Sequence, residues 1–218
     1  MDLREDMMST DRPNLNAAYA LKTPGDSQRL YRQWADTYDT SFARDQDYVY
    51  PMVVAEVFAE YAPRTSAKVL DVGAGTGLVG AALSALGDWQ VDGVDISPEM
   101  LSRARAKGHY RALFTGDLTN RLDRPDGSYD ALLSAGTFTH GHLGPEVLDE
   151  LLRIARKDAL FVLGVNKDHF SASGFPDKLA ALASQVADTK LVDRKIYGPN
   201  AAADHRDDLA SIVVFRKT

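Results

Sequence analysis

Short apolar runs alternate with amphipathic segments along most of this chain, from residue 67 to its end. The apolar runs predict strands at 67–72, 90–95, 110–115, 129–134, 159–165, 190–197 and 210–216. The segments between them have apolar residues at helical spacing and predict helices at 77–86, 98–107, 145–156 and 176–187. Strands that alternate with helices indicate an α/β fold with a doubly wound, seven-stranded, mostly parallel sheet. Because only 198–209 join the last two strands, we expect an antiparallel strand at one edge.

The N-terminal part of the chain has a different pattern. Residues 1–25 have no periodicity and predict a flexible N-terminal arm, followed by a single domain over 26–218. A stripe of large side chains at helical spacing then predicts one helix, and 48–62 predict a second. The stripe consists of Leu30, Trp34 and Tyr38. Such a stripe is usually core, so this helix is either part of the core or a lid over a site.

A glycine-rich turn follows the first predicted strand, in the sequence VLDVGAGTGLVG at 69–80. A strand, a glycine turn and a helix in this order often hold a nucleotide-like cofactor. Starting at Gly75, GTGLVG fits the dinucleotide pattern, with an acid at Asp95 where the ribose contact is expected. An NAD(P)-dependent oxidoreductase is therefore one alternative. However, Gly73 and Ala74 separate this pattern from the strand, and the chain has no P-loop pattern.

Four polar side chains lie at the ends of four successive strands. They are Asp71, Asp95, Asp117 and Ser134. Ligands of open parallel sheets bind outside the carboxyl ends of the strands, so we expect these side chains to face one crevice. No Lys or Arg occurs between Val69 and Asp88, which favours a ligand without phosphates. S-adenosylmethionine offers the ribose diol, adenine amino group and positive charge that suit two acids.

These motifs together resemble the class I S-adenosylmethionine-dependent methyltransferases, which have a Rossmann-like fold. The matching segments are YRQWADTYD at 31–39, DVGAGTG at 71–77, VDISPEML at 94–101 and GDL at 116–118. A narrower likeness, over 134–166, is to the branch that includes the methyltransferase-like protein of the Williams–Beuren region. The resemblance implies methyl transfer from S-adenosylmethionine to a small molecule, with S-adenosylhomocysteine as the product.

The resemblance implies that the glycine loop holds the methionine part of the cofactor. Gly73, Gly75 and Gly77 would let the backbone approach it, and Asp71 would brace the loop. Ser134 and Ala135 would line the sulfonium side. The predicted N-terminal helices would cover this end as a lid. The lid residues are Tyr31, Trp34 and Tyr38.

The resemblance also implies contacts for the adenosine part. Asp95 would bind the ribose hydroxyls, and Ile96 would pack on adenine. Asp117 would accept a hydrogen bond from the adenine amino group, near the backbone N–H of Leu118. Both acids have a simpler explanation as well, since aspartate is common at helix N-caps and in turns.

His140 and His142 follow the fourth predicted strand, where a methyl acceptor is expected. Either histidine could act as a general base or shape the substrate site. The H-x-H pattern could also bind a metal, but no acid lies within three residues, so we expect none. The acceptor atom could be nitrogen or oxygen. A non-catalytic protein that binds an adenosyl ligand remains a further alternative.

The composition limits the remaining function classes. The net charge of −6 disfavours a general nucleic-acid binder, which needs a basic surface. The chain has no cysteine, so thiolate chemistry and disulfides are excluded. The N-terminus has no secretory signal pattern, and no apolar run is long enough to span a bilayer. We therefore expect a cytoplasmic protein without a membrane partner.

Overall fold

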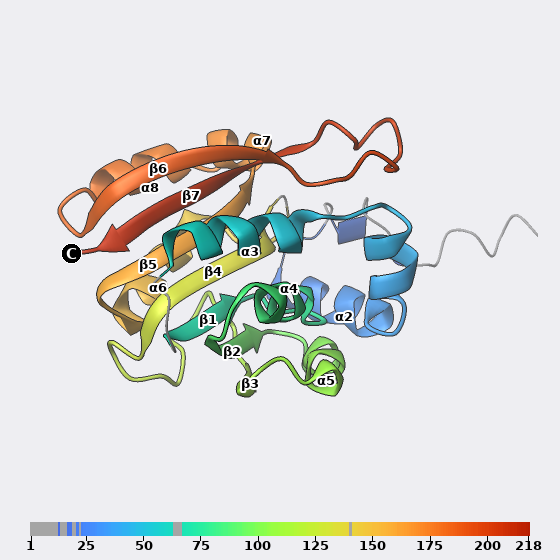
Figure 1. The fold of residues 1–218 in the computed structure, drawn as a ribbon, viewed down its shortest axis with the longest axis horizontal. Coiled ribbons are helices and arrows are strands. Elements are labelled where there is room, and N and C mark those ends of the chain that lie inside the picture. Colours follow the sequence, from blue (N-terminus) through green and yellow to red (C-terminus); the bar gives the residue numbers. More distant parts are fainter. Residues whose placement is uncertain (1–12, 14–16, 19–20, 22, 63–66, 140) are drawn as a thin grey trace, which may run out of the picture.

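The computed structural model describes residues 13, 17–18, 21, 23–62, 67–139 and 141–218 (Figure 1). Its strands are β1 (Lys68–Val72), β2 (Gln90–Asp95), β3 (Ala112–Thr115), β4 (Tyr129–Phe138), β5 (Ala155–Asn166), β6 (Val186–Lys195) and β7 (Leu209–Lys217). Its α-helices are α2 (Pro24–Trp34), α3 (Tyr50–Tyr61), α4 (Leu78–Leu86), α5 (Pro98–Lys107), α6 (Leu148–Ile154), α7 (Lys167–Ala172) and α8 (Phe175–Ala181). A π-helix spans Tyr38–Arg44, and a 3₁₀ helix spans Pro145–Val147.

The strands form one seven-stranded sheet in the order β3-β2-β1-β4-β5-β7-β6. The pairs among β1 to β5 are parallel, whereas β7 runs antiparallel to both β5 and β6. The α/β class, the seven strands and the antiparallel pair at one edge are confirmed. The order changes direction between β1 and β4, so a ligand crevice is expected outside their carboxyl ends.

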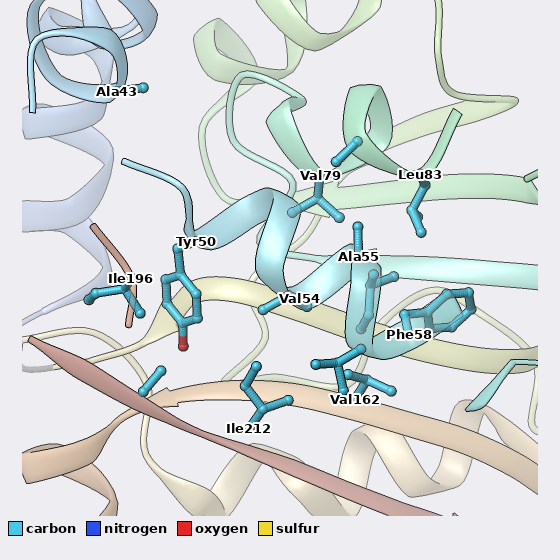
Figure 2. Close-up of a cluster of buried hydrophobic side chains, with 14 of the residues drawn as sticks. Ala43, Tyr50, Val54, Ala55, Phe58, Val79, Leu83, Val162, Ile196 and Ile212 are labelled. Carbon is cyan, nitrogen blue, oxygen red and sulfur yellow. The ribbon is translucent and has the colours of Figure 1, made fainter. Parts of the chain in front are cut away.

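Helices cover both faces of the sheet (Figure 1). In β1, Val69 packs in one hydrophobic cluster and Leu70 in the other, because successive strand residues point to opposite faces. The first cluster includes Val54 and Phe58 of α3, which lie against Val162 of β5 (Figure 2). The second cluster contains side chains of α6, α7 and α8. Among the described residues, no helix is both long and apolar enough to span a membrane.

Several predicted boundaries are wrong. The helix predicted at 176–187 ends at Ala181, and Val186 already pairs with Lys217 in the sheet. Val186 begins β6, the edge strand of the sheet. Most side chains of β6 are exposed, so its sequence has only a weak apolar pattern. The strand predicted at 159–165 begins at Ala155, directly after α6. Helix α7 was not predicted, and the side chain of Asn166 caps it.

The aromatic stripe near the N-terminus does not lie on one continuous helix. Helix α2 ends at Trp34, and Tyr38 opens the π-helix. The rings of Trp34, Tyr38 and Phe42 lie 5.0 to 5.4 Å apart, so the wider turn keeps them in one cluster. The flexible arm predicted at 1–25 falls mostly outside the described residues. Within it, Ala18 is buried.

Candidate functional site

A cavity of about 290 Å³ lies at the carboxyl ends of the parallel strands. Its wall combines four parts of the chain: the N-terminal helices, the glycine turn after β1, the ends of β2 and β3, and the end of β4 with its following loop. Predicted site residues that line it are Tyr31, Tyr38, Gly73, Gly75, Asp95, Ile96, Asp117, Leu118, Ala135 and His142. The crevice predicted from the strand order therefore exists.

The three glycines of the turn have different tasks. All of them have positive φ angles, which favour glycine: 75° at Gly73, 52° at Gly75 and 88° at Gly77. A Cβ atom on Gly73 would lie 1.9 Å from Oγ1 of Thr137, and one on Gly77 would lie 3.0 Å from Cβ of Ala104. On Gly75 it would meet nothing within 4 Å. Gly73 and Gly77 thus permit close packing, whereas Gly75 exposes its backbone to open space beside the cavity.

Asp95 closes β2 and braces the glycine turn. Its Oδ2 accepts a hydrogen bond of 2.9 Å from the N–H of Gly75, and its Oδ1 accepts one of 2.8 Å from the N–H of Ser97. Burial raises the pKa of Asp95, and these backbone donors partly oppose the rise. Ser97 in turn caps α5, since its hydroxyl accepts from the N–H of Met100. The bracing role and the ligand role can coexist, because each carboxylate oxygen has a further lone pair.

Asp71 and Ser134 lie behind the cavity wall. Oδ2 of Asp71 accepts a hydrogen bond of 2.7 Å from the hydroxyl of Tyr110, which itself accepts from the N–H of Gly80. Oδ1 of Asp71 is buried and has no hydrogen-bond partner among the described residues. Burial raises the pKa of Asp71 to about 7, opposed by the Tyr110 hydrogen bond. The Ser134 hydroxyl donates to the carbonyl of Val72 at 2.7 Å.

Asp117 and Leu118 line the cavity just after β3. Oδ1 of Asp117 accepts from the N–H and the hydroxyl of Thr119, and Oδ2 accepts from the side-chain amide of Asn120. The structure therefore gives Asp117 the turn role that sequence reasoning left open, in a position that also faces the cavity. Leu118 is 7% exposed and packs in the second hydrophobic cluster.

Two of the three predicted lid rings line the cavity. The Tyr31 hydroxyl lies 2.7 Å from Nε2 of His142, which joins α2 to the loop after β4. Tyr38 also lines the wall, whereas Trp34 is 3% exposed and packs among Tyr31, Tyr38 and Phe42. His140 lies outside the described residues.

Asp39, which sequence reasoning passed over, fastens the π-helix to the glycine turn. Its Oδ1 accepts a hydrogen bond of 2.5 Å from the Thr76 hydroxyl, and its Oδ2 lies 2.5 Å from Nζ of Lys107. Nζ of Lys107 also donates to the carbonyl of Thr76 at 2.7 Å. Asp39 ends the YRQWADTYD segment, and that motif is the sequence feature that could have predicted its role. Tyr110 lies between a helix and a strand, and no motif in the sequence predicts its contact with Asp71.

The charges of the wall indicate what can bind there. Among the described residues that line the cavity, two are acids, Asp95 and Asp117, and none is Lys or Arg. A ligand with several phosphates would have no cationic partner in this lining. A ligand with a net positive charge and hydrogen-bond donors fits it. S-adenosylmethionine meets both conditions, and the open space at Gly75 leaves room for a closely approaching group.

Comparison with known proteins agrees with this geometry. Residues 69–158 match the family model described as a methyltransferase domain. Residues 69–158 therefore form a methyltransferase domain, and the fold is that of the class I S-adenosylmethionine-dependent methyltransferases. The cofactor of this domain is S-adenosylmethionine, so the dinucleotide alternative for GTGLVG is not retained. Methyltransferase-like protein 27 from Homo sapiens is 35% identical over 143 residues, which are 64% of this chain. The aligned part spans 58% of the human protein's length.

Solved structures support the fold. A TehB-like methyltransferase from Corynebacterium glutamicum is 23% identical, with a TM-score of 0.56 over 90% of this chain and 100% of its own. The [4+2]-cyclase SpnF is 14% identical, with a TM-score of 0.65 over 91% and 97%. Because one neighbour of this methyltransferase domain is named a cyclase, the fold alone does not define the reaction. The descriptions of these proteins do not mention the Williams–Beuren region, so the narrower likeness to that branch stays a prediction.

Proposed function

We propose that this protein transfers a methyl group from S-adenosylmethionine to nitrogen or oxygen of a small-molecule acceptor. The observation that carries the proposal is the cavity beside Gly75, whose described lining holds two acids and neither Lys nor Arg. The match to a methyltransferase domain supports the reaction class. A cytoplasmic location, expected from the sequence, remains part of this proposal.

The cofactor supplies an electrophilic methyl group, whose carbon–sulfur bond breaks as the acceptor's lone pair bonds to carbon. The chain's own residues bind and orient. We assign Asp95 to the ribose hydroxyls, Ile96 to the adenine face, and Asp117 with the Leu118 backbone to the adenine edge. The glycine turn holds the methionine end, and Asp71 braces that turn through Tyr110. Holding two reactants in line can supply much of the rate without a covalent intermediate.

Tyr31 and His142 are assigned to the acceptor's proton. Both line the cavity, and the Tyr31 hydroxyl lies 2.7 Å from Nε2 of His142. A proton released by the acceptor can pass to the oxygen of Tyr31 while the proton of Tyr31 passes to Nε2. A hydroxyl acceptor needs such a route more than a neutral amine does.

Binding of S-adenosylhomocysteine tests the cofactor site. We expect calorimetry to detect S-adenosylhomocysteine and no binding of NADH. Asp95→Ala removes a charged acceptor, so the affinity should fall about tenfold to a hundredfold. Asp88→Ala, at an exposed acid before β2, is the matched control and should bind normally. Unchanged affinity in a folded Asp95→Ala protein would refute the assignment of Asp95.

Methyl transfer itself is tested with radiolabelled S-adenosylmethionine and a metabolite extract. Label should appear in a small-molecule fraction, and mass spectrometry of the labelled product identifies whether the methyl group is on nitrogen or oxygen. A protein that binds S-adenosylhomocysteine but labels nothing across extracts would favour the alternative of a non-catalytic adenosyl-ligand binder.

A further inference from the structure

A second, smaller cavity of about 40 Å³ adjoins the cofactor cavity. The two cavities share lining residues from the segment 31–48, from the end of β4 and from the loop after β4. The shared residues are Tyr31, Tyr38, Tyr48, Gly136 and His142. A single water needs roughly 10–15 Å³ of such space, so the smaller cavity has room for a group of about three heavy atoms. It is therefore sized for the reacting end of a small molecule.

The lining of this smaller cavity is aromatic and uncharged. Seven described lining residues carry Tyr, Trp or Phe rings: Tyr31, Trp34, Tyr38, Phe42, Tyr48, Tyr50 and Tyr197. None of the described lining residues is Asp, Glu, Lys or Arg. Apart from His142, the described lining offers a buried carboxylate or phosphate no counter-ion, and burying an unpaired charge is costly. A cation is attracted by the negative faces of aromatic rings without needing an acid.

Two further tyrosine rings of this lining lie close to Tyr48: the ring centroids of Tyr50 and Tyr197 are 6.0 and 5.4 Å from that of Tyr48. Burial raises the pKa of Tyr48 well above its ordinary value, and Tyr38, Tyr197, Tyr50 and Tyr31 each raise it further. Tyr48 is therefore a neutral phenol near pH 7, and its oxygen brings partial negative charge to the cavity wall. Gly136 makes the approach possible, because a Cβ atom there would lie 2.8 Å from the Tyr48 hydroxyl. The positive φ of 82° at Gly136 also favours glycine.

We propose that the smaller cavity is the methyl-acceptor subsite and that it takes the protonated amino group of a small amine. This inference rests on the proposed function. The amine must lose one proton before its nitrogen can attack, and a neighbouring sulfonium favours that loss by charge repulsion. The proton goes to the oxygen of Tyr31 as the Tyr31 proton moves to Nε2 of His142. The nitrogen lone pair then forms the N–C bond while the C–S pair stays on sulfur.

Three probes with the same chain length and different charge test the subsite: butylammonium, 1-butanol and butanoate. Each is titrated calorimetrically into the protein saturated with S-adenosylhomocysteine. We expect butylammonium to bind about tenfold more tightly than 1-butanol, because only the cation gains from the rings. Butanoate should bind more weakly than either probe.

Tyr197 provides the matched pair of variants, since it lines the smaller cavity and not the cofactor cavity. Tyr197→Phe keeps the ring face and should retain butylammonium binding within about threefold, whereas Tyr197→Leu should lose about tenfold. Both variants should bind S-adenosylhomocysteine normally. If Tyr197→Leu does not fold, the comparison of the three probes on the unaltered protein still decides.

Three results would overturn the inference: equal binding of butylammonium and 1-butanol, no binding of butylammonium to the S-adenosylhomocysteine complex, or tighter binding of butanoate. The proposed function would survive each of them. Absence of S-adenosylhomocysteine binding, by contrast, would refute the proposed function itself.

Discussion

At the scale of single residues, the buried carboxyl group of Asp71 lowers the free energy of unfolding when it must ionise. Its side chain is fully buried, burial raises its pKa to about 7, and one oxygen has no described partner. In an unfolded chain an aspartate ionises near pH 3.9. Between about pH 4 and 7 the folded state therefore holds one proton more than the unfolded state. It follows that this residue's contribution to stability falls as the pH rises through that window.

Asp71→Asn should remove this dependence, because an amide keeps the acceptor for Tyr110 and cannot ionise. The variant's free energy of unfolding, relative to the unaltered protein, should rise by about 1.4 kcal/mol per pH unit between pH 5 and 7 and then level off. Urea denaturation at pH 5, 6, 7 and 8 measures it. Asp123→Asn, at an exposed acid, is the control and should show no trend. A constant difference across the series would mean that Asp71 is already ionised at pH 5.

At the scale of elements, the contact of the π-helix with the glycine turn depends on Asp39. Asp39→Ala removes the partner of both Thr76 and Lys107. Lys107 and Asp39 are partly exposed, so solvent screens this ion pair, and we expect S-adenosylhomocysteine affinity to fall only about threefold to tenfold. Trypsin cleavage at Arg44 should become faster. Asp123→Ala, at an exposed acid outside this segment, should change neither measurement. Equal cleavage rates for Asp39→Ala and Asp123→Ala would show that Asp39 does not fasten the helix.

The elements also show where sequence patterns are informative. Helix α5 is predicted at its observed bounds, because Ser97 and Pro98 begin it and Gly108 ends it with a left-handed φ of 75°. Such local signals do not depend on the rest of the fold. The break between Trp34 and Tyr38 accompanies contacts with distant segments, from Asp39 to Thr76 and from Tyr31 to His142, and β6 depends on pairing with β7. Neither tertiary contact leaves a periodic trace in the local sequence.

The candidate site likewise has features that the sequence predicts and features that depend on tertiary contacts. Strand-end position correctly predicted that Asp95 and Asp117 face the cavity. It could not tell that Asp71 and Ser134 turn behind the wall, because their hydrogen bonds go to Tyr110 and to the Val72 carbonyl. The aromatic lining of the smaller cavity was also missed, since its residues come from separate segments that only the fold brings together.

At the scale of the whole molecule, the cofactor cavity lies between two parts of the chain. The sheet supplies one side through the ends of β1 to β4, and α2 with the π-helix supplies the other through Tyr31 and Tyr38. A bound ligand touches both parts, so binding should stabilise the molecule and protect the N-terminal helices together. This is the lid prediction in a form that does not require Trp34, which is buried in the aromatic cluster.

We therefore expect S-adenosylhomocysteine at a hundredfold excess over its Kd to add about 2.7 kcal/mol to the free energy of unfolding. For a chain of this size that is a Tm increase of roughly 5–10 °C. Trypsin cleavage at Arg29 and Arg32, which are exposed on α2, should slow by a larger factor than cleavage at exposed Arg194 on β6, far along the sheet from the cavity. NADH at the same concentration is the control ligand and should change neither measurement. A rise in Tm with equal slowing at all three arginines would mean that the ligand stabilises the molecule globally and that the N-terminal helices do not act as a lid.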